Sequence, residues 1–327
     1  MQILLVILIV LALVFDFLNG YIGSSSIVAT VISSRALSPR PALAMTAVAE
    51  FVGPFLFGTA VALTVGHDLV DVEAIDAAAI LAALVAAIAW SLFTSYFGWP
   101  SSTSHALVGG LVGAALAAGG PEAVFLSGLQ KVLLALLLSP VLGLALAYIA
   151  LKMLYFAARG APPSINTAFK RMQLVTAPVL ALSHSANDAQ KAMGVIAMSM
   201  VVTGYTSAFE VPGWVVALCA LAIALGTAVG GWRMIRKLGG EFYKIRPVHA
   251  FGSQASSGAV ILTAGLLGGP VSSTQVISSA IVGAGAADRP SKVRWTVFRD
   301  IAVAWLLTIP LTALLAAGLY LVVSQFI

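Results

Sequence analysis

Two short stretches of this sequence decide the fold that it predicts. They read Gly-Trp-Pro-Ser-Ser-Thr-Ser at residues 98–104 and Gly-Gly-Pro-Val-Ser-Ser-Thr at residues 268–274. Each lies inside a long apolar run, residues 77–120 and residues 247–287. Because proline and glycine interrupt helices, we expect each run to form two helices joined by a tight connection.

The composition places these runs in a membrane. Of the 327 residues, 60% are hydrophobic and 9% are charged, and the mean hydropathy is +1.04. Soluble domains carry about 25% charged residues, so this chain has too little polar surface to cover itself in water. Its length is better interpreted as a series of bilayer crossings of about 20 residues each. The apolar N-terminus lacks the basic start of a signal peptide and is expected to be the first membrane segment.

The charged residues predict the topology. All Lys and Arg residues except Lys131 and Lys191 fall in four breaks, within residues 35–40, 152–171, 233–246 and 289–299. Basic breaks face the cytoplasm, which also argues against nucleic-acid binding as the reason for the net charge of +5. Both termini are then external, and each of the two interrupted runs enters and leaves on one side. We therefore expect two re-entrant hairpins whose tips lie at membrane depth, inside protein or beside a cavity.

The two halves of the chain repeat each other. At a constant offset, Pro100 matches Pro270, Gly113 matches Gly283 and Pro140 matches Pro310. The predicted domains are a first transmembrane repeat, a cytoplasmic linker and a second, inverted transmembrane repeat, at residues 1–158, 159–172 and 173–327. Inverted repeats are typical of secondary transporters, which hold the substrate near the midplane among discontinuous helices.

Each repeat opens on a segment that is long for one crossing. Residues 2–34 would form about 50 Å of helix, whereas the hydrocarbon core is about 30 Å thick. Residues 19–23 offer a break in the first segment, and the polar residues 183–191 offer one in the second. The predicted fold is thus an all-α integral membrane protein, an inverted-topology repeat with broken transmembrane helices and two re-entrant helical hairpins.

The hairpin tips are the first candidates for a binding site. They carry a run of hydroxyl residues in both repeats: Ser101, Ser102, Thr103 and Ser104, then Ser272, Ser273 and Thr274. Free N–H groups and the positive dipole end make a helix start a site for anions. Helix capping is the structural alternative. Matched clusters in both repeats favour a site for a small anion.

The polar middle of the second repeat's first segment is another candidate. An ionisable residue at membrane depth suggests a functional site, so Asp188 with Asn187 is expected to bind a coupling cation or carry a proton. Lys191 either pairs with Asp188 at helical spacing or attracts the anion. His184 lies four residues before Asp188, but further ligands for a metal site are missing nearby.

The first repeat supplies further buried polar residues. Asp16 and Glu50 are candidates for the coupling ion together with Asn19, or they are neutral and hydrogen-bonded. Ser24, Ser25 and Ser26 either contact the anion or loosen the helix. His105, which follows the first tip, is expected to form a supporting hydrogen bond.

These residues together resemble the inorganic phosphate transporter (PiT) family over nearly the whole chain. Residues 183–194 look like its G-A-N-D-x-Q-K-A-x-G signature, the hairpin tips look like P-x-S-T-T-H, and residues 15–40 and 241–254 are also similar. The resemblance implies an inverted repeat that moves phosphate with protons or sodium, in some members as a metal–phosphate complex. It matches Asn187 and Asp188 to the second acidic motif, and residues 102–104 and 272–274 to the tips that contact phosphate.

The departures from the family pattern fall mainly in the first repeat. Ile22 and Gly23 stand where the family has His-Asp or Asn-Asp, Ser26 replaces the next asparagine, and Gln275 replaces a hairpin histidine. The resemblance therefore predicts a shared anion site and a one-sided coupling site at Asp188. Sulfate permeases resembling this family also lack the first acidic motif, so sulfate is an alternative substrate.

The sequence thus predicts a multi-pass carrier for inorganic phosphate in the inner or plasma membrane. It would work by alternating access with Na⁺ or H⁺ as coupling ion, without a catalytic site, a metal site or another cofactor. The alternatives are a sulfate or other oxyanion permease, a passive anion channel and a membrane enzyme, for which no suitable nucleophile–base–acid set is found. The expected partners are the anion and membrane lipid, with a homodimer as one option and no nucleic acid.

Overall fold

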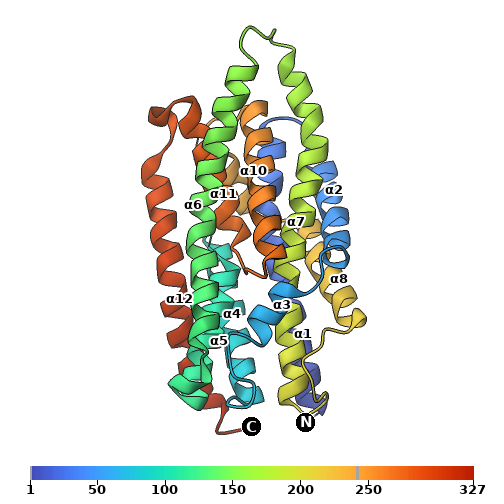
Figure 1. Ribbon diagram of the computed structural model, residues 1–327, viewed down its shortest axis with the longest axis vertical. Helices are drawn as coiled ribbons and strands as arrows, with labels where there is room; N and C mark the ends of the chain where they lie inside the picture. The colour runs from blue at the N-terminus through green and yellow to red at the C-terminus, as the bar shows by residue number, and fades with distance from the viewer. Residues whose placement is uncertain (1, 100, 241–242) are drawn as a thin grey trace.

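The computed structural model describes residues 2–99, 101–240 and 243–327, and these residues form twelve α-helices, three short 3₁₀ helices and no β-strand. The all-helical prediction is confirmed for this part of the chain. Three residues used in the sequence comparison lie outside the described residues: Pro100, Glu241 and Phe242. Figure 1 shows helices running side by side along one long axis, with both termini at the same end.

Two long helices form the centre of the bundle, and neither is broken. They are α1 (Gln2–Ser33) and α7 (Ile165–Val202), of 32 and 38 residues. The prediction of broken helices at these segments is therefore wrong. Tilting, or projecting beyond the hydrocarbon layer, accommodates such lengths without a break.

The residues expected to interrupt α1 instead let it pack closely. A Cβ atom at Gly20 would overlap the backbone of Ile223 in the neighbouring helix α8 (Gly213–Val229), so glycine permits that approach. The Ser26 hydroxyl donates to the Gly23 carbonyl of its own helix at 2.7 Å. Such back-bonding satisfies a buried hydroxyl without opening the helix.

The interrupted span is the next one along the chain, where no break was predicted. It consists of α2 (Pro39–Val52), a 3₁₀ turn (Gly53–Phe55) and α3 (Ala60–Gly66), with a bend of 77° between the two parts. Gly58, at φ +69°, lies in the connection. Two amides in the first turn of α3, at Val61 and Ala62, donate to the Gln190 side chain of α7 at 2.8 and 3.3 Å, which satisfies N–H groups that lack a partner within the helix.

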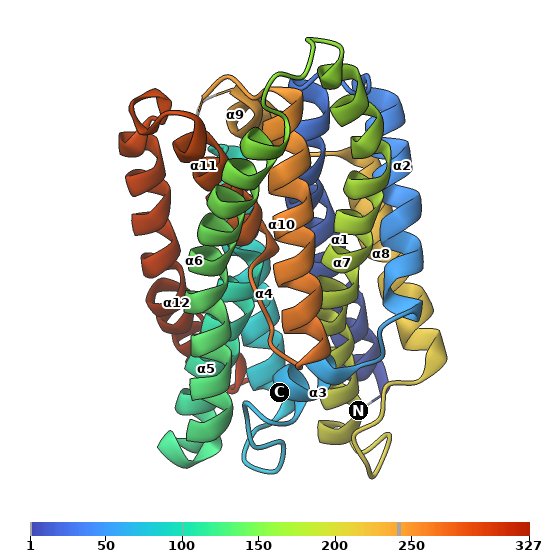
Figure 2. The same cartoon turned by 45° about the horizontal axis from the view of Figure 1, so that its top comes forward.

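Two helical hairpins enter the bundle from opposite ends. The pair α4 (Ala77–Tyr96) and α5 (Thr103–Gly119) lies toward the lower end in Figures 1 and 2, whereas α10 (Pro247–Leu266) and α11 (Ser273–Asp288) lie toward the upper end. We call residues 97–99 and 101–102, with the first turn of α5, the first tip, and residues 267–272, with the first turn of α11, the second tip. They touch: the Ser104 hydroxyl donates to the Val271 carbonyl at 3.0 Å.

The remaining elements cover the hairpins. Helix α12 (Trp295–Val323) packs on α5, and α6 (Leu126–Ala157) packs on α11. Helix α9 (Trp232–Gly240) packs on α1, and two 3₁₀ turns, Pro121–Ala123 and Pro290–Lys292, follow α5 and α11.

The outer helices have the apolar surface of a membrane protein. Helices α6 and α12 expose many large apolar side chains, among them Leu134 and Leu314. Within the described residues, α1, α4, α6 and α12 are each long and apolar enough to cross a bilayer, and the bent α2–α3 pair would make a fifth crossing. The chain is a multi-pass membrane protein, and its polar residues are gathered inside the bundle.

Candidate functional site

A buried lysine marks the point where the two tips meet α7. Lys191 is only 1% exposed. Its ammonium group donates to the Ser104 hydroxyl of the first tip at 2.7 Å and to the Val271 carbonyl of the second tip at 2.7 Å. It also forms an ion pair with Asp188, one turn earlier on the same helix. One cation therefore joins both hairpins to the central helix.

The Asp188 carboxylate is fully engaged. One oxygen pairs with Lys191, and the other accepts a hydrogen bond from the Ser273 hydroxyl at 2.6 Å. The same second oxygen lies 2.9 Å from Nε2 of His184. A charged group at this depth is tolerated only with such partners. Of the two alternatives for Lys191, this structure contains the pair with Asp188, and the role of Lys191 toward an anion stays a prediction.

Two asparagines hold the tips in position. The Asn187 amide donates to the Gly269 carbonyl at 3.0 Å and accepts from the Val271 amide at 3.2 Å, which fixes the second tip. Asn19 on α1 accepts from the Thr103 hydroxyl at 2.6 Å and donates to the Asp188 carbonyl at 3.3 Å. Both amides are thus engaged with protein groups in this structure.

His184, which the sequence suggested only as an incomplete metal ligand set with Asp188, is the residue at the centre of the acidic groups. Its imidazole is fully buried between two carboxylates, 2.9 Å from Glu50 on α2 and 2.9 Å from Asp188. Glu50 also accepts a hydrogen bond from the Thr227 hydroxyl of α8. The spacing of His184 and Asp188 by four residues indicated a shared helix face, but the sequence alone did not show that Glu50 lies opposite.

The imidazole of His184 fills the space beside Gly23. A Cβ atom at that glycine would overlap the ring. A larger side chain at position 23 would therefore require His184 to move. The carboxylate that the family resemblance predicts at position 23 is replaced in space by a side chain from α7.

Asp16 is the third buried carboxyl group near this network. It lies on α1, one turn before Asn19, within range of electrostatic interaction with Asp188, Glu50 and His184. Its two carboxylate oxygens accept no hydrogen bond of ordinary geometry from the described residues. Asp16 therefore offers buried acceptor capacity at both oxygens, and Glu50 offers it at one.

Several predicted site residues form other contacts. Ser102 and Ser272 cap α5 and α11 by accepting from the amides of His105 and Gln275, at 3.0 and 3.4 Å. This matches the capping alternative. The side chains of His105 and Gln275 also approach to 3.3 Å, which links the two tips a second time. Thr274 is buried beside them in the first turn of α11.

The serines of α1 and Ser101 lie outside the Lys191 network. Ser24, Ser25 and Ser26 bond to carbonyls of their own helix, and Ser25 also bonds to Gly231 at the start of the α9 region. Ser101 accepts from the Trp90 indole at 3.0 Å and lies 3.2 Å from the Thr308 hydroxyl. Its side chain faces α4 and α12.

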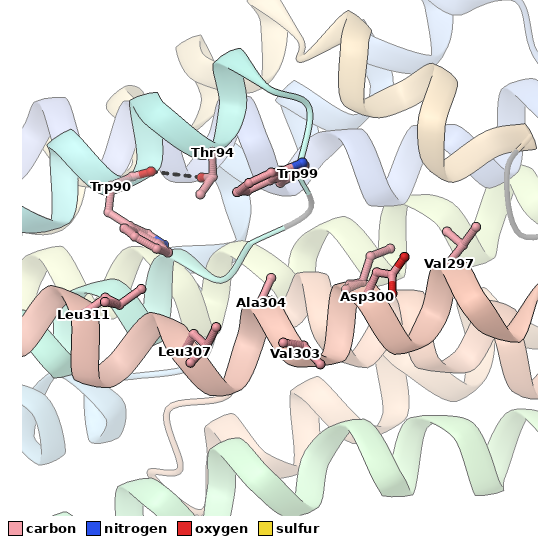
Figure 3. A pocket seen from close by; sticks show the side chains of 10 residues that line it. Trp90, Thr94, Trp99, Val297, Asp300, Val303, Ala304, Leu307 and Leu311 are labelled. Atoms are coloured by element: carbon pink, nitrogen blue, oxygen red, sulfur yellow. Dashed lines mark hydrogen bonds between the residues drawn. The ribbon is translucent and has the colours of Figure 1, made fainter.

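Neither a metal cluster nor a large cavity accompanies this network in the described residues. They contain no group of three or more His, Cys, Asp or Glu side chains arranged to hold a metal ion. A cavity of about 510 Å³ lies between α4 and α12, lined by Trp90, Trp99 and apolar α12 side chains, with Asp300 at one end (Figure 3). Its apolar walls make it unsuited to an inorganic anion, so the site is the closed network around Lys191.

The arrangement can exchange ligands. Lys191 and the tip hydroxyls are donors suited to an oxyanion, and His184, between Glu50 and Asp188, is a group suited to a proton. An anion that takes Lys191 leaves Asp188 with an unpaired charge. An anion at Lys191 would therefore compete with Asp188 for the same ammonium group.

Known proteins share the sequence of this chain over nearly its whole length. Residues 19–316 match the model of the phosphate transporter family (PHO4). The chain is 41% identical over 327 residues to a Bacillus subtilis protein named "Probable low-affinity inorganic phosphate transporter", covering 99% of this chain and 98% of that one. A Rhizobium meliloti protein of the same name is 42% identical, covering 97% of this chain and 96% of that one.

A solved structure shares the fold. The structure described as "The sodium-dependent phosphate transporter" superposes with a TM-score of 0.89 at 25% identity, and each chain is covered completely. These relatives are transporters, and the chain is not an enzyme. The resemblance to the inorganic phosphate transporters is confirmed, and the chain belongs to the phosphate transporter family.

Proposed function

We propose that this chain is a secondary carrier that moves inorganic phosphate across the cell membrane by alternating access. The observation that carries the proposal is the position of Lys191. This buried cation is bound by Ser104 from one hairpin and by Val271 from the other, and the hairpins enter from opposite ends of the bundle (Figure 2). A phosphate bound there would contact both halves of the protein.

Alternating access follows from the inverted arrangement of the halves. We propose residues 1–158 and 173–327 as the repeats and residues 159–172 as the cytoplasmic linker. In support, α5 packs on α12 while α11 packs on α6, so each hairpin leans on the last long helix of the other half. Opening one hairpin at a time would expose Lys191 to one side, as inverted-repeat carriers generally require.

The exchange of partners at Lys191 provides the coupling step. Phosphate would take the ammonium and the hydroxyls of Ser104 and Ser273, and Asp188 would then need a cation. Binding the anion without the cation leaves a buried carboxylate unpaired, which is costly. The same rule disfavours binding the cation alone while Lys191 remains paired. The carrier is thus expected to move both ions or neither.

We favour the proton as the coupling ion. His184 lies between Glu50 and Asp188 and fills the space of the missing first-repeat carboxylate beside Gly23. Imidazole takes and releases a proton near physiological pH. Sodium is the second candidate, because the solved relative is described as sodium-dependent. In that case, Asp16 would supply the free carboxylate oxygens.

We also propose which end of the protein faces the outside of the cell. The break at residues 68–76 carries only acidic charges, while residues 152–171 and 233–246 are basic. By the charge bias, the acidic end, where both termini lie (Figure 1), faces outward. A homodimer is compatible with the lipid-facing surfaces but is not required for the site.

Uptake into proteoliposomes tests the proposal. Labelled phosphate should accumulate when a proton gradient is imposed, and an excess of unlabelled phosphate should compete while sulfate does not. If only a sodium gradient drives accumulation, the coupling ion is Na⁺ and not the proton. Equal competition by sulfate would make the protein a general oxyanion carrier, and uptake that never exceeds equilibrium under any gradient would contradict secondary transport.

A further inference from the structure

Lys131 is a cation on the acidic side of the protein. It is the only Lys or Arg between residues 41 and 151, and it lies in the second turn of α6. Helix α6 begins just after Glu122, and the loop that precedes α4 carries four more acids, Asp68, Asp71, Glu73 and Asp76. A phosphate approaching this end meets mostly negative charge, so one cation here has a large influence on its path.

The ammonium group of Lys131 is held loosely. It donates to the Thr64 hydroxyl of α3 at 2.9 Å, and it lies 3.9 Å from the Asp68 carboxylate. The Lys131 side chain is 45% exposed and lines a cavity of about 370 Å³ together with His67, Asp68 and Ser127. An exposed ion pair of this kind contributes little to stability. An incoming anion can therefore displace Asp68 at small cost.

Lys131 also adjoins the second tip. A Cβ atom on Gly268 would lie 3.4 Å from the Lys131 ammonium nitrogen and 3.3 Å from the Thr64 hydroxyl, so both groups face the connection between α10 and α11. The next residues of that connection bind the inner site, because the carbonyls of Gly269 and Val271 accept from Asn187 and Lys191. Lys131 thus lies on the outer side of the tip whose inner side holds Lys191.

We propose that Lys131, with the Thr64 hydroxyl, forms an outer binding station for inorganic phosphate on the route to Lys191. The ammonium supplies a positive charge that suits a tetrahedral oxyanion. The Thr64 hydroxyl donates to the Ala60 carbonyl at 3.2 Å in this structure, and it supplies a second donor once it rotates toward the anion. Phosphate binds there in place of Asp68, next to the second tip that opens to admit it. This inference rests on the proposed function as a phosphate carrier.

The first test is the concentration dependence of phosphate uptake at fixed pH. Lys131→Gln should raise the KM for phosphate about three- to fivefold, as expected for a partly exposed charge contact, while Lys131→Arg stays near the wild-type value. Raising the ionic strength should raise the KM of the wild type more than that of Lys131→Gln, because salt screens an exposed charge. Asp68→Asn, which removes the competing carboxylate, should lower the KM.

A chemical rescue separates charge from structure. In Lys131→Cys, a thiol reagent that adds an aminoethyl group restores a cation, and one that adds a sulfonatoethyl group installs an anion. The first should return the KM toward wild type and the second should raise it further. The wild type, whose cysteine at position 219 is fully buried, is the control. The inference is overturned if Lys131→Gln keeps the wild-type KM and both reagents act alike. If instead the wild type takes up no phosphate at all, the proposed function fails.

Discussion

Replacing Asp188 by asparagine should destabilise the protein chiefly through Lys191. The substitution leaves an ammonium group that is 1% exposed without its counter-ion. Breaking a buried ion pair by removing one partner costs about 3–5 kcal/mol. At about 2 °C per kcal/mol for a chain of this size, thermal unfolding in detergent should shift down by roughly 6–10 °C.

A double-mutant cycle isolates the pair. Lys191→Met removes the cation and its hydrogen bonds to Ser104 and Val271, so it should also destabilise. The double variant with Asp188→Asn contains no unpaired charge. Its loss of stability should therefore be smaller than the sum of the two single losses by about 2–3 kcal/mol. Asp300→Asn, at a carboxylate that is 70% exposed, is the matched control and should be neutral.

Additivity would refute the reasoning. If the two single losses sum to the double loss within about 0.5 kcal/mol, the ion pair does not hold its partners together. An Asp188→Asn variant as stable as the wild type would lead to the same conclusion about the ion pair.

Other residues give separate predictions. His184→Gln should abolish proton-driven phosphate accumulation and keep phosphate–phosphate exchange, and loss of exchange as well would place His184 in anion binding instead. Gly23→Asp should cost about 1–3 kcal/mol through overlap with the imidazole, a loss that unfolding measurements should find reduced in combination with His184→Ala. Ser273→Ala, which deprives Asp188 of a donor, should slow uptake roughly tenfold, whereas Ser101→Ala should remain within about twofold, and equal effects would remove the distinction between the two serines. Partial burial raises the pKa of Asp288, but hydrogen bonds from two basic side chains hold that pKa below its ordinary value. Asp288→Asn should therefore cost at most about 1 kcal/mol at neutral pH, and this difference from wild type should vanish as pH falls through the native pKa.

The hairpins could be predicted from sequence because their punctuation is local. Gly98 and Gly268, both at positive φ, follow the end of one helix, and Ser102 and Ser272 start the next by capping it. Both effects depend only on neighbouring residues. The pairing of Lys191 with Asp188 was also accessible, because it follows from helical spacing.

The breaks were harder to predict, because glycine and serine have two uses in a membrane helix. In α1 they permit close packing and back-bonding, as at Gly20 and Ser26, and the helix continues. In residues 53–58 the combination of Gly53, Pro54 and Gly58 does interrupt the span. Whether a glycine permits close packing or ends a helix depends on which residue packs against it, and that residue is distant in sequence, as Ile223 is from Gly20.

The position of His184 shows the same limit. Its partner Glu50 is 134 residues away in sequence on α2, and the space it fills is beside Gly23 on α1. A single sequence does not reveal that three helices meet there. The first repeat has Gly23 where the family has a carboxylate, and the structure shows that the His184 imidazole of the second repeat occupies that space.

Gradient-driven phosphate uptake by Asp188→Asn in proteoliposomes tests whether one buried ion pair links the anion to the coupling cation. If it does, this variant should reconstitute with the wild-type orientation but accumulate no phosphate under an imposed proton or sodium gradient. Asp300→Asn, at a carboxylate that is 70% exposed, should still accumulate it. Accumulation by Asp188→Asn at the wild-type rate would contradict the account.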